Sequence, residues 1–158
     1  MNRVLPMQSA FAAIVLVVLA CGHDDPAEVL KREMLSEVNK LRTSGCICGE
    51  DTMPPVQEVV WDESLTIAAK RHLNDMIDND FFNHIGSDGS TPASRASDAG
   101  FEGAYIGENI ARGYINVQDV MNRWKNSENH CKTIMDFHYL YLGFAADQYY
   151  WVQLFGSD

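Results

Sequence analysis

The stretch Gly107-Glu108-Asn109-Ile110-Ala111-Arg112-Gly113 places a carboxylate inside a short, partly apolar segment. Glycines stand at both ends of it, so we expect a short strand over 107–111. A glutamate in such a strand can simply accept backbone hydrogen bonds, or it can belong to a polar site. The segment therefore predicts a strand, and its function depends on what the surrounding sequence brings to Glu108.

Helical and extended patterns alternate on both sides of this strand. Apolar residues recur at helical spacing over 27–43, and Asp62 is a suitable N-cap for a second helix that ends near 79. Thr91-Pro92 resembles an N-cap followed by proline at the first helical position. The remaining expected elements are a loop over 46–55, a helix over 117–126, a short turn or helix over 130–136, and strands over 141–146 and 149–155 joined by an Asp147-Gln148 turn.

Length and composition limit the classes of protein that this chain can belong to. It has 158 residues, a formal net charge of −10 and 46% hydrophobic residues, which suits one globular domain with a substantial core. The acidic balance lacks the basic surface that binds a phosphate backbone, so we expect no nucleic-acid partner. Four cysteines are too few for a small scaffold built from disulfides.

The N-terminus has the pattern of an export signal. Arg3 precedes an unbroken apolar run over 10–20, which is shorter than the roughly 20 residues needed to cross a bilayer core. A run of this length fits the hydrophobic region of a signal peptide. We therefore predict a signal peptide over 1–20 and a mature chain that works outside the cytoplasm, where disulfides persist.

A lipid attachment site is expected directly after the signal peptide. Val18-Leu19-Ala20-Cys21 resembles a bacterial lipobox, in which the cysteine becomes the lipidated N-terminus, although Val18 stands where leucine is usual. The resemblance implies a lipoprotein held at the outer membrane or cell surface through Cys21. The alternative is a plain secretory signal with an incidental cysteine. We expect a lipidated tether over 21–26 and one domain over 27–158.

Four motifs follow one another along the mature chain. Each is weak alone, and their order makes the set specific. In chain order they are H-x-G-x-D-G-x-T-P from His84, G-E-N-I-A-x-G from Gly107, W-x-x-S-x-x-H-C-x-x-I-M from Trp124, and Y-W-x-Q-x-F-G from Tyr150. Together they resemble the CAP superfamily of cysteine-rich secretory, antigen 5 and pathogenesis-related class 1 proteins, also called SCP-like domains. The resemblance implies an α+β fold: a three-layer αβα sandwich with a central antiparallel sheet.

The family resemblance also implies a cleft lined by histidines and glutamates. His84 and His130 match the two histidines, and Glu108 matches the glutamate of the G-E-N motif. Ser127 stands where many eukaryotic members have a second glutamate. The adjacent Glu128 is turned by about 100° on a helix, so it is not expected to replace it.

Two imidazoles in one cleft can bind Zn²⁺ or Cu²⁺ with positions left open for water. We therefore expect His84 and His130 as metal ligands, with Glu108 and Ser127 behind them. Glu108 would orient an imidazole or accept a proton from bound water. Zinc or copper is the only cofactor that the sequence suggests.

Three functions are compatible with this set of residues. The first is a binding module for a small ligand, lipid or peptide. The second is an extracellular hydrolase, metal-assisted or of serine type, with His84, Glu108 and His130 as candidate catalytic residues. The third is a structural surface protein with a polar network satisfied within itself. The missing second glutamate favours a non-enzymatic role. His72 is expected as a partly buried packing residue, and His138 as an exposed one.

The cysteines are assigned through the same resemblance. Related bacterial sequences carry a C-G before the first long loop and a later H-C, which implies a disulfide between Cys48 and Cys131. This bridge would anchor the backbone beside His130. Cys46 remains free or exchanges with the bridge as an alternative partner of Cys131, because a Cys46–Cys48 bond would be strained. A Cys-x-Cys pair near a histidine could also bind a metal.

Overall fold

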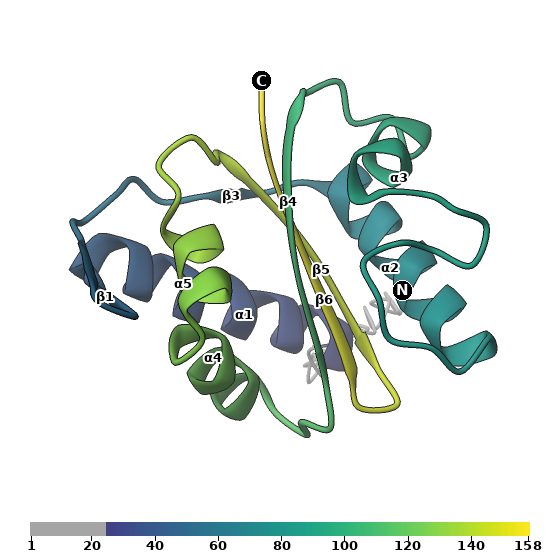
Figure 1. Ribbon diagram of the computed structural model, residues 1–158, viewed down its shortest axis with the longest axis horizontal. Helices are drawn as coiled ribbons and strands as arrows, with labels where there is room; N and C mark the ends of the chain where they lie inside the picture. Colours follow the sequence, from purple (N-terminus) through teal and green to yellow (C-terminus); the bar gives the residue numbers. More distant parts are fainter. Residues whose placement is uncertain (1–24) are drawn as a thin grey trace, which may run out of the picture.

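The computed structural model describes residues 25–158. The expected signal peptide, the lipidation site at Cys21 and most of the expected tether lie outside this range. Within it the chain forms helices and strands in mixed order (Figure 1). These are α1 (Pro26–Ser44), β1 (Cys46–Cys48), β2 (Asp51–Met53), β3 (Val60–Trp61), α2 (Glu63–Asp78), α3 (Pro92–Asp98), β4 (Tyr105–Arg112), α4 (Val117–Lys125), α5 (Glu128–Met135), β5 (Tyr141–Asp147) and β6 (Tyr150–Ser157).

A four-stranded sheet with the order β3-β5-β6-β4 forms the centre of the domain. Strand β6 pairs antiparallel with both β4 and β5, as the sequence predicted for the central sheet. The short edge strand β3 differs, because it pairs parallel with β5. The two strands are not joined by a hairpin, because α2, α3, β4, α4 and α5 lie between them along the chain.

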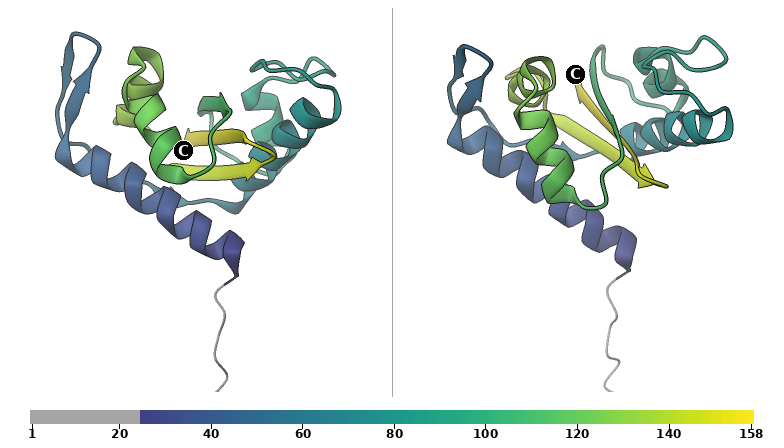
Figure 2. Two further views of the ribbon diagram at one scale, coloured as in Figure 1. Left: turned by 90° about the horizontal axis from the view of Figure 1, so that it is seen from below. Right: turned by 60° about the horizontal axis from the view of Figure 1, so that its bottom comes forward.

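Helices cover both faces of this sheet, which confirms the expected α+β sandwich of three layers. Helices α2 and α3 lie on one side, and α1, α4 and α5 lie on the other (Figures 1 and 2). Alternate side chains of strand β6 point to opposite faces of the sheet, so this strand contributes to the apolar core on each face. Val152 and Leu154 pack in the α2 cluster, whereas Trp151 and Phe155 pack in the cluster that contains Trp124. The domain therefore has two apolar cores separated by one sheet.

The N-cap residues in the sequence correctly predicted where two helices begin. Asp62 accepts a hydrogen bond from the backbone N–H of Leu65, and Thr91 forms a capping box with Ser94. Both caps lie where the sequence predicted them. Within residues 25–158, no helix combines the length and apolar character needed to cross a membrane.

Two turns differ from the expectation. The hairpin between β5 and β6 turns at Gln148-Tyr149, where both residues have positive φ, one position later than predicted. Residues 46–55, expected as a loop, contain the small antiparallel hairpin of β1 and β2. Gly49, with φ of 64°, begins its two-residue turn. Neither turn has the Asn-Gly or Asp-Gly pair that would have marked it in the sequence.

Candidate functional site

Glu108 of β4 connects two neighbouring elements through its two carboxylate oxygens. Its side chain is only 1% exposed. Oε1 lies 2.7 Å from Nδ1 of His84, and Oε2 accepts a 2.7 Å hydrogen bond from Nη2 of Arg95. Because a carboxylate only accepts, Nδ1 of His84 carries the proton. In the neutral imidazole, Nε2 is the nitrogen that carries the lone pair.

Arg95 of α3 supports this carboxylate, a role that was not predicted from the sequence. It is buried, and it also donates to the carbonyl oxygens of Ser90 at 2.9 Å and His84 at 3.1 Å. One guanidinium thus balances the buried charge of Glu108 and fixes the loop that carries His84. No local sequence pattern indicates which carboxylate an arginine will pair with across two elements.

His72 of α2 supports the same loop from inside the domain. It is completely buried, rather than partly buried as expected. Its Nε2 lies 2.8 Å from the carbonyl oxygen of Asn83 and 3.8 Å from Oε1 of Glu108. Burial lowers the pKa of His72, and the negative charge of Glu108 offsets only part of that effect. His72 is therefore neutral at neutral pH, with Nε2–H donating to Asn83.

His130 enters from the opposite side of β4, on the first turn of α5. Ser127 is the N-cap residue of α5, but its hydroxyl forms no capping bond and lies 2.9 Å from Nδ1 of His130. The buried Asn109 of β4 donates to the His130 carbonyl oxygen at 3.2 Å. Burial lowers the pKa of His130, and the positive charge of Arg123, together with that of His84 when it is protonated, lowers it further. This imidazole is also neutral at neutral pH.

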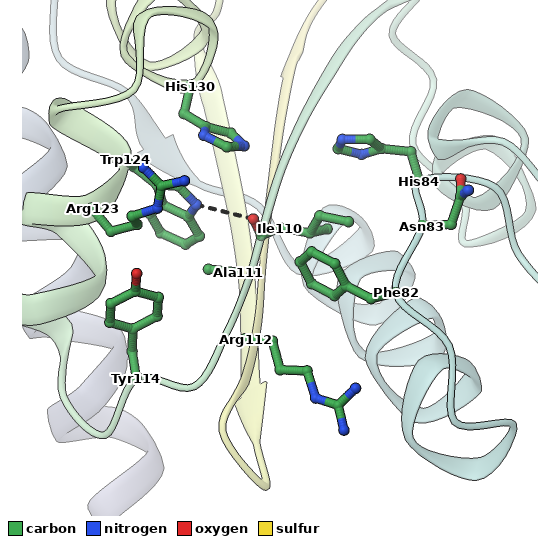
Figure 3. Close-up of a pocket in the computed structure, with 10 residues that line it drawn as sticks. All are labelled: Phe82, Asn83, His84, Ile110, Ala111, Arg112, Tyr114, Arg123, Trp124 and His130. Carbon is green, nitrogen blue, oxygen red and sulfur yellow. Dashed lines mark hydrogen bonds between the residues drawn. The ribbon is translucent and has the colours of Figure 1, made fainter.

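The two imidazoles line one cleft of about 420 Å³. His84 from the 79–91 loop and His130 from α5 point toward one another across β4 (Figure 3). The cleft is bounded by residues from that loop, β4, α4 and α5. Its lining consists of Phe82, Asn83, His84, Ile110, Ala111, Arg112, Tyr114, Arg123, Trp124 and His130. Of these, the sequence analysis proposed only the two histidines as site residues, because no motif placed the aromatic and arginine side chains around them.

Ser127 and Glu128 lie away from the open part of this cleft. Ser127 contacts His130 from behind, and neither residue belongs to the cleft lining. Glu128 forms an ion pair with Lys132 at 2.7 Å, in agreement with the expectation that it does not replace a second glutamate. The cleft therefore combines two histidines with one buried carboxylate.

A disulfide between Cys48 and Cys131 ties the β1–β2 hairpin to α5, which confirms the expected pairing. Cys131 directly follows His130, so the bridge restrains the backbone that carries this ligand candidate. Cys46 is a free thiol, with its Sγ 3.5 Å from Sγ of Cys131 and 3.7 Å from Sγ of Cys48. Burial raises the pKa of the Cys46 thiol, and Lys125 offsets this in part. A raised pKa leaves little reactive thiolate at neutral pH.

The family to which the sequence matches agrees with this geometry. Residues 35–155 match the family model described as CAP, the cysteine-rich secretory protein family. The chain belongs to the CAP family. This match begins within α1, ends within β6 and includes every residue of the cleft lining.

Relatives of this CAP protein are known by sequence and by structure. An uncharacterised membrane protein of Bacillus subtilis is 30% identical over 95 residues, which make up 60% of this chain and 28% of the relative. A second uncharacterised protein of that organism is 31% identical over 96 residues, or 60% of this chain and 37% of the relative. The chain thus spans about a third of the length of these curated relatives.

Two solved structures share the fold. An extracellular protein with an SCP domain from Bacillus anthracis aligns with a TM-score of 0.72 and 22% identity, over 87% of this chain and 45% of its own. An outer surface protein of Borrelia burgdorferi also aligns with a TM-score of 0.72 and 22% identity, over 86% and 98% of the two chains. At this identity the likeness shows the fold.

Proposed function

We propose that this CAP protein is an extracytoplasmic binding module whose cleft holds a divalent transition metal ion, Zn²⁺ or Cu²⁺, between His84 and His130. The observation that carries the proposal is the way in which the two imidazoles are held. Each has its Nδ1 hydrogen bonded to a side chain behind it, Glu108 or Ser127, while the rings point toward one another across β4 (Figure 3). Metal-binding histidines have this arrangement, because the bond at one nitrogen fixes the lone pair of the other.

The chemistry of the residues fits such an ion. The lowered pKa of His130 keeps this imidazole neutral, as a ligand must be. Two imidazoles suit zinc or copper, and the remaining positions stay open for water or a bound ligand. Because structural zinc sites use four protein ligands and catalytic sites usually three, a pair of histidines supports reversible binding. Glu108 would orient His84, and Ser127 would orient His130.

The same contacts support binding rather than hydrolysis. The carboxylate of Glu108 is 1% exposed, does not belong to the cleft lining and already accepts from Arg95 and His84, so it is poorly placed to take a proton from a metal-bound water. The hydroxyl of Ser127 contacts His130 from outside the cleft lining, where a nucleophile would not reach a bound ligand.

Removing either histidine is expected to weaken zinc binding. Loss of a residue that only orients a ligand typically costs about 10–100-fold in metal affinity, so we expect His84→Ala and His130→Ala each to cost at least about tenfold. Isothermal titration calorimetry with ZnCl₂ measures this, in a Cys46→Ser background that removes the free thiol.

His138→Ala is the matched control. His138 is exposed and bonded to Asp136, away from the cleft lining, so its removal should leave zinc affinity unchanged. Equal zinc affinity in the parent protein and in both cleft variants would contradict the metal site.

We further propose that a lipid on Cys21 anchors the protein to a membrane, as its lipobox-like sequence suggests. Labelling with radioactive palmitate in a bacterial host should mark the full chain, and Cys21→Ser should lose the label. Cys46→Ser serves as the control and should keep it, because its thiol belongs to the folded domain. Label retained by Cys21→Ser would place the lipid elsewhere, and a parent chain without label would exclude it.

A further inference from the structure

The cleft has the opposite charge to the rest of the chain. The sequence carries a net charge of −10, yet no aspartate or glutamate belongs to the cleft lining. Two arginines supply its charge instead. The one carboxylate close by, Glu108, is 1% exposed and already paired with Arg95 and His84. The cleft is therefore a positive site on an acidic protein.

Arg123 supplies a cation without a counter-charge. Within residues 25–158 it forms no hydrogen bond and no ion pair, and its guanidinium lies beside Trp124 on the His130 side of the cleft (Figure 3). Arg112 lies at the opposite side (Figure 3). Its contacts are a 3.5 Å approach to the exposed Asp80 and stacking on Tyr150 at 4.6 Å. The guanidinium of Arg123 is thus available to an anion that enters the cleft, whereas that of Arg112 is shared with Asp80 and Tyr150.

Apolar and aromatic walls lie between these two cations. Phe82 from the loop faces Tyr114 and Trp124 across the floor formed by Ile110 and Ala111 of β4 (Figure 3). Trp124 is fixed in place, because its indole N–H donates to the carbonyl oxygen of Ile110 at 3.3 Å. A cleft with apolar walls and a few polar groups is the usual form of a small-molecule site.

We propose that the cleft binds a small ligand with an aromatic or apolar body and one carboxylate, which Arg123 holds in place with support from Arg112. A guanidinium pairs with a carboxylate through two parallel hydrogen bonds, so it selects the charge and the planar shape together. This inference rests on the proposed role of the cleft as a ligand site. It assigns the chemical class of that ligand independently of any metal ion.

A pair of probe molecules isolates the charge. The probes 2-naphthoate and 2-naphthamide share one ring system and similar size, and they differ by one negative charge. Their affinities are measured by calorimetry, with a chelator present so that no metal ion can bridge ligand and protein. The side-chain N–H signal of Trp124, followed by NMR, reports whether binding occurs in the cleft.

We expect 2-naphthoate to bind at least about tenfold more tightly than 2-naphthamide, because only the carboxylate forms charge-assisted bonds with the guanidinium. Arg123→Gln should reduce this preference to within about threefold. Lys125→Gln is the matched control, since it removes the same charge from the same helix at a position outside the cleft lining. It should leave the preference unchanged.

Three outcomes would overturn the proposal. These are equal binding of the two probes or none of either, an equal loss in Lys125→Gln and Arg123→Gln, and binding that leaves the Trp124 signal unmoved. A titration with ZnCl₂ alone tests the metal site separately. Zinc binding without a preference for the carboxylate would overturn this inference and leave the proposed metal site standing. A preference for the carboxylate without zinc binding would support this inference and contradict the metal site.

Discussion

Replacing Arg95 with alanine is expected to lower the free energy of unfolding by about 3–5 kcal/mol, because it leaves a buried charge without its partner. The carboxylate of Glu108 is 1% exposed and takes a 2.7 Å hydrogen bond from Arg95. The substitution also removes the donors to the carbonyl oxygens of Ser90 and His84. Urea denaturation followed by circular dichroism measures the change.

Two further variants identify the cause. Arg71→Ala removes an exposed arginine of α2 and should change the free energy of unfolding by less than about 0.5 kcal/mol. Adding Glu108→Gln to the Arg95 variant should recover part of the loss, because no uncompensated charge then remains buried. If the double variant is no more stable than Arg95→Ala, packing rather than charge compensation explains the effect.

The bridge between the β1–β2 hairpin and α5 gives the second large effect. A disulfide that closes a loop of 83 residues stabilises a fold by about 4 kcal/mol in the chain-entropy description. Removing Cys48 alone is expected to cost much less, since Sγ of Cys46 lies 3.5 Å from Sγ of Cys131 and can form the bridge instead. The Cys46→Ala, Cys48→Ala double variant should show the full loss.

Urea denaturation gives the stability of these variants, and a thiol assay under denaturing conditions counts their free cysteines. After purification in air, a chain that lacks residues 1–24, and with them Cys21, should contain no free thiol as Cys48→Ala and none as Cys46→Ala. A stability of Cys48→Ala equal to that of the double variant would show that Cys46 cannot replace Cys48.

The fold was predictable from sequence where the signals are local. Asp62 and Thr91 marked helix starts because an N-cap acts on backbone groups two or three residues away. The turn at Gln148-Tyr149 was placed one residue early, because neither residue is a glycine or asparagine that would reveal positive φ. The family resemblance supplied the sandwich, which no single segment indicates.

Some residues of the site could be predicted from the sequence and others could not. His84, Glu108 and His130 were found through the family motifs, and the structure brings the two imidazoles to one cleft. The contact of Arg95 with Glu108 depends on how α3 packs beside β4, which the sequence pattern of neither element contains. Arg123 was given no role from the sequence, because its neighbourhood is created only when α4 lies against β4.

Strand β4 holds both imidazoles by neighbouring residues that face opposite layers: Glu108 holds the ring of His84, and Asn109 holds the backbone of His130. The separation of the rings is consequently set by the pleat of a single strand at the edge of the central sheet. The cleft walls come from the 79–91 loop and from α4. Substitutions at these wall positions need not move β4, which positions the two histidines. One unchanged pair of histidines can thus be combined, in different members of such a lineage, with walls suited to quite different ligands.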